Sequence, residues 1–198
     1  MVPNGGPVLA AVFDFDGTLV DTMPLHYEAY RCAFAECCQA DLTEEQFFAT
    51  SGGTAREVLP KLLLQVGSDV PPDVVHSRKK HLLRELLDRA DIPVLETAKL
   101  LPLLAPHLKI AMASSGSREG IEIMLERLGW TQWFDVVVTG EDVRRGKPAP
   151  DAFELAAERL GVAPERCMAF EDTDAGVGAA RSAGMEVFDV RATGARRR

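Results

Sequence analysis

Cysteine is scarce in this 198-residue sequence and is not arranged for a metal or for a disulfide framework. The four cysteines are Cys32, Cys37, Cys38 and Cys167. Two of them are adjacent, and none belongs to a CxxC pair of the kind that binds zinc. The spacing also lacks the regular pattern of small secreted proteins. We therefore interpret all four as free thiols in a reducing compartment.

Long apolar runs are also missing. No stretch approaches the roughly 18 residues that a membrane span requires, and no basic segment followed by an apolar one stands at the N-terminus. We therefore expect a cytoplasmic protein without a membrane partner. We also expect a monomer, although nothing in the sequence decides the oligomeric state. A net charge of −8 argues against a nucleic-acid partner and requires any phosphate site to carry its own cations. The terminal arginines, Arg191 and Arg196 to Arg198, are interpreted as a solvated end.

The sequence does contain a series of short apolar runs separated by helical patterns. The runs are continuously apolar, as in strands that are buried on both faces of a parallel sheet. They lie at residues 8–13, 109–113, 135–139, 167–170 and 186–190. Glycines at 129, 161 and 184 are placed to end the helices between them. This alternation predicts an α/β fold with a doubly wound, Rossmann-like parallel sheet.

One stretch interrupts the alternation. Between residues 22 and 92 there is no strand-like run, and helical patterns occupy residues 25–38, 44–49, 55–65 and 73–89. We expect this segment to be an inserted helical cap domain, with residues 1–21 and 93–198 forming the α/β core domain. Pro102 lies inside a further helical pattern at 95–104 and should kink or shorten that helix.

Acidic residues follow the first predicted strand, where the chain reads DFDGTLVD from Asp14 to Asp21. In an extended chain Asp14 and Asp16 project from the same face. Two carboxylates this close repel each other, and a bound cation would reduce that repulsion. Ligands bind at the carboxyl ends of the strands in open α/β sheets, and these residues stand at that end. The alternative interpretation is a turn held by Asx hydrogen bonds.

Polar residues also follow the other predicted strands. Ser114 and Ser115 precede a helix, whose N-terminus can bind an anion, although a simple serine cap is the commoner explanation. Lys147 stands between glycine and proline and can hold a phosphate charge, or it can be a solvated loop lysine. Glu171 and Asp172 offer oxygen ligands to a hard cation, or partners to a helix dipole. Independent explanations would not place all four sets at one edge of a sheet.

With these motifs the sequence resembles the haloacid dehalogenase superfamily of phosphotransferases, in the branch with a helical cap after the first motif. The resemblance covers residues 8–190 and includes DFDGTLVD, ASSGS, GKPAPD and FEDTDAG. It is most similar to the β-phosphoglucomutase and fructose-1-phosphate phosphatase group, on the segments DTMPLH at 21–26 and KPAPD at 147–151.

The resemblance implies an enzyme that uses Mg²⁺ and forms an aspartyl-phosphate from a small phosphorylated metabolite, a sugar or polyol phosphate. It makes Asp14 the nucleophile and Asp16 the general acid and base, from which we expect a bell-shaped pH–rate profile. It assigns the metal to Asp14, Asp172 and the Asp16 backbone carbonyl, with support from Glu171. It assigns the phosphoryl oxygens to Ser114, the Ser115 N–H and Lys147.

Substrate contacts are expected from the cap, which would close over the site and exclude water. The candidates are His26, the loop at 51–54 with Gly52 and Gly53, Arg56 and Lys79. A packing role for His26 and a solvated basic face for Lys79, beside Arg78 and Lys80, are the alternatives.

Three other functions compete with hydrolysis. A phosphosugar mutase would use the same aspartyl-phosphate, and Thr18, where the mutases carry a smaller apolar residue, favours the phosphatase. An inactive regulatory relative would have lost the nucleophile or an acid, and none is missing here. A dehalogenase would not need Asp16 or the acids expected to bind the metal.

Overall fold

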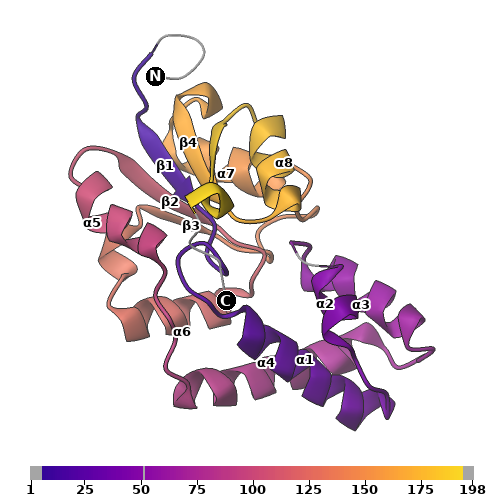
Figure 1. Cartoon of the computed structure of the whole chain (residues 1–198). Helices are drawn as coiled ribbons and strands as arrows, with labels where there is room; N and C mark the ends of the chain where they lie inside the picture. The colour runs from indigo at the N-terminus through magenta and orange to yellow at the C-terminus, as the bar shows by residue number, and fades with distance from the viewer. Residues whose placement is uncertain (1–5, 51, 194–198) are drawn as a thin grey trace.

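The computed structural model describes residues 6–50 and 52–193, and its centre is a five-stranded sheet. All strand pairs are parallel, and the order across the sheet is β3-β2-β1-β4-β5 (Figure 1). Ala11 of β1 is registered between Ile110 of β2 and Met168 of β4. The strands are β1 Ala10–Phe13, β2 Lys109–Ala113, β3 Val136–Val138, β4 Cys167–Glu171 and β5 Glu186–Asp189.

Each predicted strand is therefore confirmed in position, with ends that differ by one or two residues. The central strand shows why its run is continuously apolar, since all four of its residues are fully buried. Ala11 and Phe13 enter one hydrophobic cluster, and Ala10 and Val12 enter another on the opposite face. Both faces of the sheet are thus covered, as a doubly wound fold requires.

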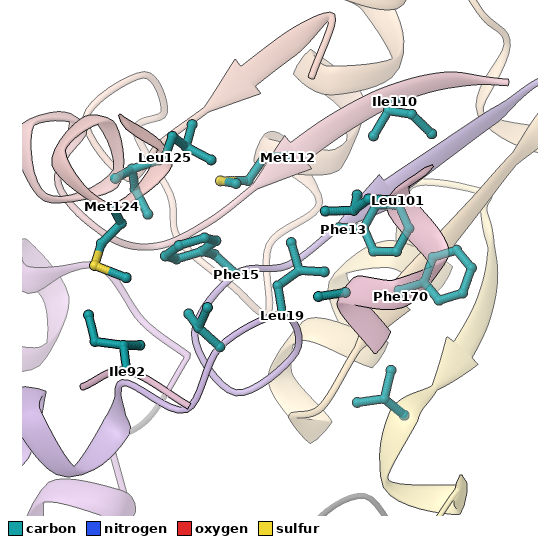
Figure 2. Packing of buried hydrophobic residues seen from close by; sticks show 14 of the residues in the cluster. Phe13, Phe15, Leu19, Ile92, Leu101, Ile110, Met112, Met124, Leu125 and Phe170 are labelled. Atoms are coloured by element: carbon teal, nitrogen blue, oxygen red, sulfur yellow. The ribbon is translucent and has the colours of Figure 1, made fainter. Parts of the chain in front are cut away.

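Helices supply the two covering layers. On one face α5 and α6 pack around Phe13, Met112 and Phe170 (Figure 2). The rings of Phe13 and Phe170 stack, with their centroids 4.4 Å apart. On the other face α7 and α8 pack through small residues and Phe153. The bounds are α5 Leu101–Leu104, α6 Arg118–Leu128, α7 Asp151–Leu160 and α8 Asp174–Ser182.

The first four of the helices between β1 and β2 in the sequence form a separate group beside the sheet (Figure 1). They are α1 Met23–Cys38, α2 Glu44–Phe48, α3 Ala55–Gln65 and α4 Pro72–Arg89. They enclose their own cluster of buried side chains, which includes Phe34, Leu62 and Val75. The inserted helical cap is confirmed, whereas its exact boundaries at residues 22 and 92 stay a prediction.

Prolines explain where helix ends differ from expectation. Helices α1 and α4 begin earlier than predicted because Pro24 and Pro72 lie in their first turns, where the missing N–H has no helical acceptor to lose. Pro102 does shorten its helix: residues 96–100 form a 3₁₀ turn, and α5 has only four residues. Gly129 and Gly161 end α6 and α7 with φ values of 67° and 65°, as predicted.

Four short 3₁₀ helices complete the secondary structure of the described residues: η1 Glu96–Leu100, η2 Thr131–Trp133, η3 Pro164–Arg166 and η4 Val190–Thr193. Within residues 6–50 and 52–193 no helix is both long and apolar enough to cross a membrane. The predicted solvated arginines at 196–198 lie outside the described residues, as does Ser51 of the predicted cap loop.

Candidate active site

Polar side chains from three separate strand ends meet at the carboxyl edge of the sheet. Lys147 reaches this edge from the loop after β3, and its Nζ lies 2.6 Å from Asp14 Oδ1 and 2.5 Å from Glu171 Oε1. Asp14 follows β1, and Glu171 ends the neighbouring strand β4. All three side chains are buried, with exposed fractions of 4%, 6% and 0% for Lys147, Asp14 and Glu171. The Lys147 ammonium also lies 5.1 Å from the centre of the Phe153 ring.

The charges in this cluster act on one another. Burial raises the pKa of Asp14 well above its usual range, and Glu171 and Asp172 raise it further, against the opposing effect of Lys147. Burial lowers the pKa of Lys147, but Asp14 and Glu171 more than reverse this and raise it overall. Lys147 therefore stays charged, whereas ionised Asp14 needs positive charge beside it.

The acids at the end of β4 are held by the turn that leads into α8 and by Thr18. One oxygen of Glu171 accepts the backbone N–H groups of Asp172 and Thr173 at 2.8 and 2.9 Å. The hydroxyl of Thr18 donates to Asp172 Oδ1 at 3.1 Å. Gly176 lies so close that a Cβ there would stand 1.8 Å from Glu171 Oε1. Glu171 is thus fixed by the backbone N–H groups that follow it, and Asp172 by the hydroxyl of Thr18.

The same carboxylates fit a divalent metal ion. Asp14, Glu171 and Asp172 each offer an oxygen, these oxygens lie within 4.8 Å of one another, and all three residues are buried. Three carboxylates against one ammonium leave a formal charge of −3 + 1 = −2. Buried oxygen donors of this kind suit Mg²⁺. The side chain of Asp16 is not part of this set and points to a different group of residues.

Asp16 is held instead by residues at the start of the cap. His26 Nε2 lies 3.4 Å from Asp16 Oδ1, the hydroxyl of Thr22 donates to the same oxygen, and Lys79 Nζ lies 3.2 Å from His26 Nδ1. Because an ammonium only donates, His26 accepts at Nδ1 and carries its proton at Nε2, facing Asp16. The chain of donors runs from Lys79 through His26 to Asp16.

This chain keeps Asp16 ionised. Burial opposes ionisation, but His26, Thr22 and Lys79 together lower the pKa of Asp16 to about 2. Burial and Lys79 also lower the pKa of His26, against the opposing effect of Asp16. Burial lowers the pKa of Lys79 to about 8, against the opposing effect of Asp16.

The buried charge of Lys79 has a cost that can be measured. Its fall in pKa from 10.5 to about 8 corresponds to a destabilisation of the fold by about 3 kcal/mol. This destabilisation is present in full below pH 8 and disappears as the pH rises toward 10.5. We expect Lys79→Met to raise the free energy of unfolding by about 1–3 kcal/mol near pH 7, partly offset by the loss of its contact with His26. Urea unfolding at pH about 7 and about 9.5 checks this. The gain in the free energy of unfolding should be smaller at the higher pH. An equal gain at both pH values would show that the pKa of Lys79 is not lowered in the fold.

A cavity of about 500 Å³ lies between the sheet edge and the cap. Asp14, Lys147, Glu171 and Asp172 line one side, and Asp16 lines it together with His26 and Lys79. Gly52, Gly53 and Ser115 also line it, as the sequence predicts for a substrate site. An apolar wall of cap residues completes it, formed by Met23, Tyr30, Phe47, Phe48 and Val58.

Two predicted site residues are not brought to the cavity. Arg56 is exposed on α3 and is not among the described residues that line the cavity. Ser114 is buried and its hydroxyl accepts the N–H of Gly116 at 3.0 Å, so Ser115 faces the cavity in its place. Lys79, in contrast, is buried rather than solvated, and it lies 4.8 Å from the centre of the Tyr30 ring.

Sequence reasoning missed several residues of this site. Thr22, which holds Asp16, was not named from the sequence, and Thr18, which holds Asp172, was named only as a residue that favours the phosphatase. Both stand close to Asp16 in the sequence, which was the available signal. His76 and Lys80 line the cavity beside Lys79, and the spacing of three and four residues along α4 was a second signal.

The site thus combines a buried carboxylate next to a cation, an acidic cluster for a metal, and a second carboxylate beneath a cap. Residues 8–184 match the model of the haloacid dehalogenase-like hydrolase family. The chain belongs to this family and is an enzyme, with the α/β core and helical cap found among its members.

Its curated relatives include phosphatases. A phosphorylated carbohydrates phosphatase of Thermotoga maritima is 40% identical, over 89% of this chain and 82% of the relative. A fructose-1-phosphate phosphatase of Escherichia coli is 36% identical, over 91% and 95%. Among solved structures, a β-phosphoglucomutase of Clostridium difficile superposes with a TM-score of 0.82 at 27% identity, over 92% of this chain and 84% of that one.

Proposed function

We propose that this enzyme hydrolyses a small sugar or polyol phosphate through an aspartyl-phosphate on Asp14, with Mg²⁺ as cofactor. The observation that carries the proposal is the contact of Asp14 with Lys147 at 2.6 Å, at the rim of a cavity that also contains Asp16. The two phosphatase relatives act on phosphorylated carbohydrates, which supports the substrate class.

In the first step a carboxylate oxygen of Asp14 attacks phosphorus, and the bond from phosphorus to the sugar oxygen breaks. The sugar alkoxide takes a proton from Asp16, and the phosphoryl group stays on Asp14. In the second step water attacks the same phosphorus and gives a proton to Asp16. Phosphate leaves, and Asp14 is restored as a carboxylate.

Lys147 balances the charge of this chemistry, since its ammonium stands where the equatorial oxygens of the phosphoryl group would pass. Mg²⁺ bound by Asp14 and Asp172, with Glu171 in support and the backbone carbonyl of Asp16 as a further ligand, would add positive charge beside the transferring group. The Ser115 N–H is proposed as a further donor to the phosphoryl oxygens.

The environment of Asp16 suits the second step as it stands, because a pKa of about 2 keeps the carboxylate ready to accept a proton from water. The first step needs Asp16 protonated, so its bonds to His26 and Thr22 must weaken when substrate enters. His26 and Lys79 therefore control the proton on Asp16, and we propose them as the cap residues that sense the substrate.

We expect His26→Asn to move the limb of the pH–rate profile that reports Asp16 to higher pH. Without the His26 hydrogen bond burial dominates, which raises the pKa of Asp16. Activity near pH 7 should fall about tenfold, because Asp16 also loses the side chain that holds it in place for proton transfer. Phosphate release followed from pH about 4 to about 9 checks this, with His81→Asn, an exposed histidine of the same helix as Lys79, as control. Superimposable profiles of His26→Asn and the wild type would contradict it.

The function itself is tested by a phosphate-release screen over sugar, polyol and short-acid phosphates, with and without Mg²⁺. We expect release from several sugar phosphates, dependent on Mg²⁺, and none from Asp14→Asn. Full activity of Asp14→Asn, or no release from any of these substrates, would overturn the proposal.

A phosphosugar mutase is the second candidate, and the chain of Lys79, His26 and Asp16 together with the superposition on a β-phosphoglucomutase favours it. Thr18 favours hydrolysis, because the resemblance expects a smaller apolar residue at this position in mutases. In this chain the Thr18 hydroxyl donates to Asp172. Quantitative conversion of β-glucose 1-phosphate to the 6-phosphate would establish the mutase. Free phosphate without isomerised product would establish the phosphatase.

A further inference from the structure

Glu57, in the first turn of α3, joins the cap to the loop that carries Lys147. Its Oε1 accepts the backbone N–H of Gly146 at 3.0 Å. Its Oε2 accepts the backbone N–H and the hydroxyl of Thr54 at 3.0 and 2.8 Å. Because Gly146 directly precedes Lys147, one carboxylate of the cap is bonded to the backbone from which the site lysine extends.

The cap and this loop are also packed tightly against each other. A Cβ at Gly146 would stand 2.4 Å from Glu57 Oε2 and 2.8 Å from the backbone nitrogen of Thr54. Gly146 does not adopt the left-handed φ that favours glycine, so its backbone alone would accept alanine. Glycine is needed here because the start of α3 lies against it.

A second hydrogen bond joins the same two parts of the molecule. Ser115, after β2, donates its hydroxyl to the backbone carbonyl of Gly52 at 2.7 Å. The cap thus contacts the two core loops that carry the proposed phosphate-binding residues. Of these contacts the one through Glu57 is a charge-assisted hydrogen bond, which is the stronger kind.

From these contacts we infer that Glu57 is a positioning residue: when the cap lies against the core, its carboxylate fixes the Gly146 backbone and so sets the place of Lys147. This inference rests on the proposed function. It predicts that a residue outside the cavity wall affects phosphate transfer, because small displacements of a group that neutralises the transition state lower the rate steeply.

Stabilisation of the start of α3 is the competing explanation for Glu57, and the variants separate the two. Glu57→Ala removes both contacts of the carboxylate. Gly146→Ala keeps the Glu57 carboxylate itself and obstructs the approach of cap and loop from the side of the loop. Asp73→Ala removes an exposed first-turn acid from α4, and Gly178→Ala adds a methyl group where no atom lies within 4 Å, so these two are the matched controls.

The experiment measures kcat and KM for a sugar phosphate that the wild type hydrolyses, together with the thermal midpoint of each variant. We expect kcat/KM of Glu57→Ala and of Gly146→Ala to fall about 10- to 100-fold, while both controls stay within about twofold of wild type. Because both changes break one contact, the double variant should lose no more than the more impaired single variant. Glu57→Gln, which keeps an acceptor for Gly146, should recover part of the loss.

Two outcomes would overturn the inference alone: kcat/KM within twofold of wild type in both single variants, or losses that multiply in the double variant. A lowered thermal midpoint of Glu57→Ala with an unaffected Gly146→Ala would assign Glu57 to helix stability instead. A wild type that releases no phosphate from any substrate would overturn the proposed function, and the inference with it.

Discussion

Replacement of Lys147 by methionine is expected to lower phosphate release about 10²- to 10³-fold and to destabilise the fold by about 3–5 kcal/mol. The activity falls because the ammonium proposed to face the transferring phosphoryl group is lost. The stability falls because Asp14 and Glu171, whose oxygens lie 2.6 and 2.5 Å from Nζ, would be left as buried carboxylates without this cation.

Mg²⁺ separates the two effects in Lys147→Met. A divalent ion on the carboxylate cluster would restore part of the stability, because it neutralises the same oxygens, but it would not replace the lysine in catalysis. Urea unfolding with and without Mg²⁺, together with phosphate release, checks both parts. Lys99→Met, at an exposed lysine paired with Glu96, is the control and should change stability by less than about 1 kcal/mol. An unchanged stability of Lys147→Met would contradict the charge balance described above.

Replacement of Asp14 by asparagine is expected to abolish turnover, by about 10⁴-fold or more, and at the same time to stabilise the metal-free protein. The amide cannot form the acyl phosphate. The stability rises because the pKa of Asp14 is raised in the fold, so its ionised form costs free energy at neutral pH.

The expected gain in stability of Asp14→Asn depends on pH. A carboxyl with a raised pKa costs stability above its unfolded pKa, so the gain in Asp14→Asn should be largest at neutral pH and shrink as pH falls toward the usual range of aspartate. Unfolding in the presence of a chelator measures it. Mg²⁺ should stabilise the wild type more than the variant, and the opposite order would show that Asp14 is not part of the metal site.

The core of the site follows from local sequence. A run such as the one before Asp14 is apolar because both of its faces are buried, and the polar residues after such runs meet because parallel strands end at one edge. Each of these inferences needs only a short segment. The contact of Lys147 with Asp14, 133 residues apart in the sequence, follows from that shared edge.

The cap contacts do not follow in this way, because they depend on how two packed units face each other. Arg56 and Glu57 are neighbours on α3, but successive helical residues project about 100° apart, so Glu57 meets the core while Arg56 is exposed. A sequence pattern gives the helix and its apolar face but not its rotation against another domain. Lys79 shows the same limit, since its basic neighbours indicated solvent and its contacts with His26 and Tyr30 bury it.

The most direct test of the account is to trap the phosphoryl group during one turnover. Enzyme mixed with a sugar phosphate and Mg²⁺ is quenched in acid within the first turnover and digested, and the modified residue is located by tandem mass spectrometry. We predict a phosphoryl group on Asp14 that appears before free phosphate and is absent in Asp14→Asn. Steady release of phosphate with no modified Asp14 at any time, or a phosphoryl group on another residue, would contradict it.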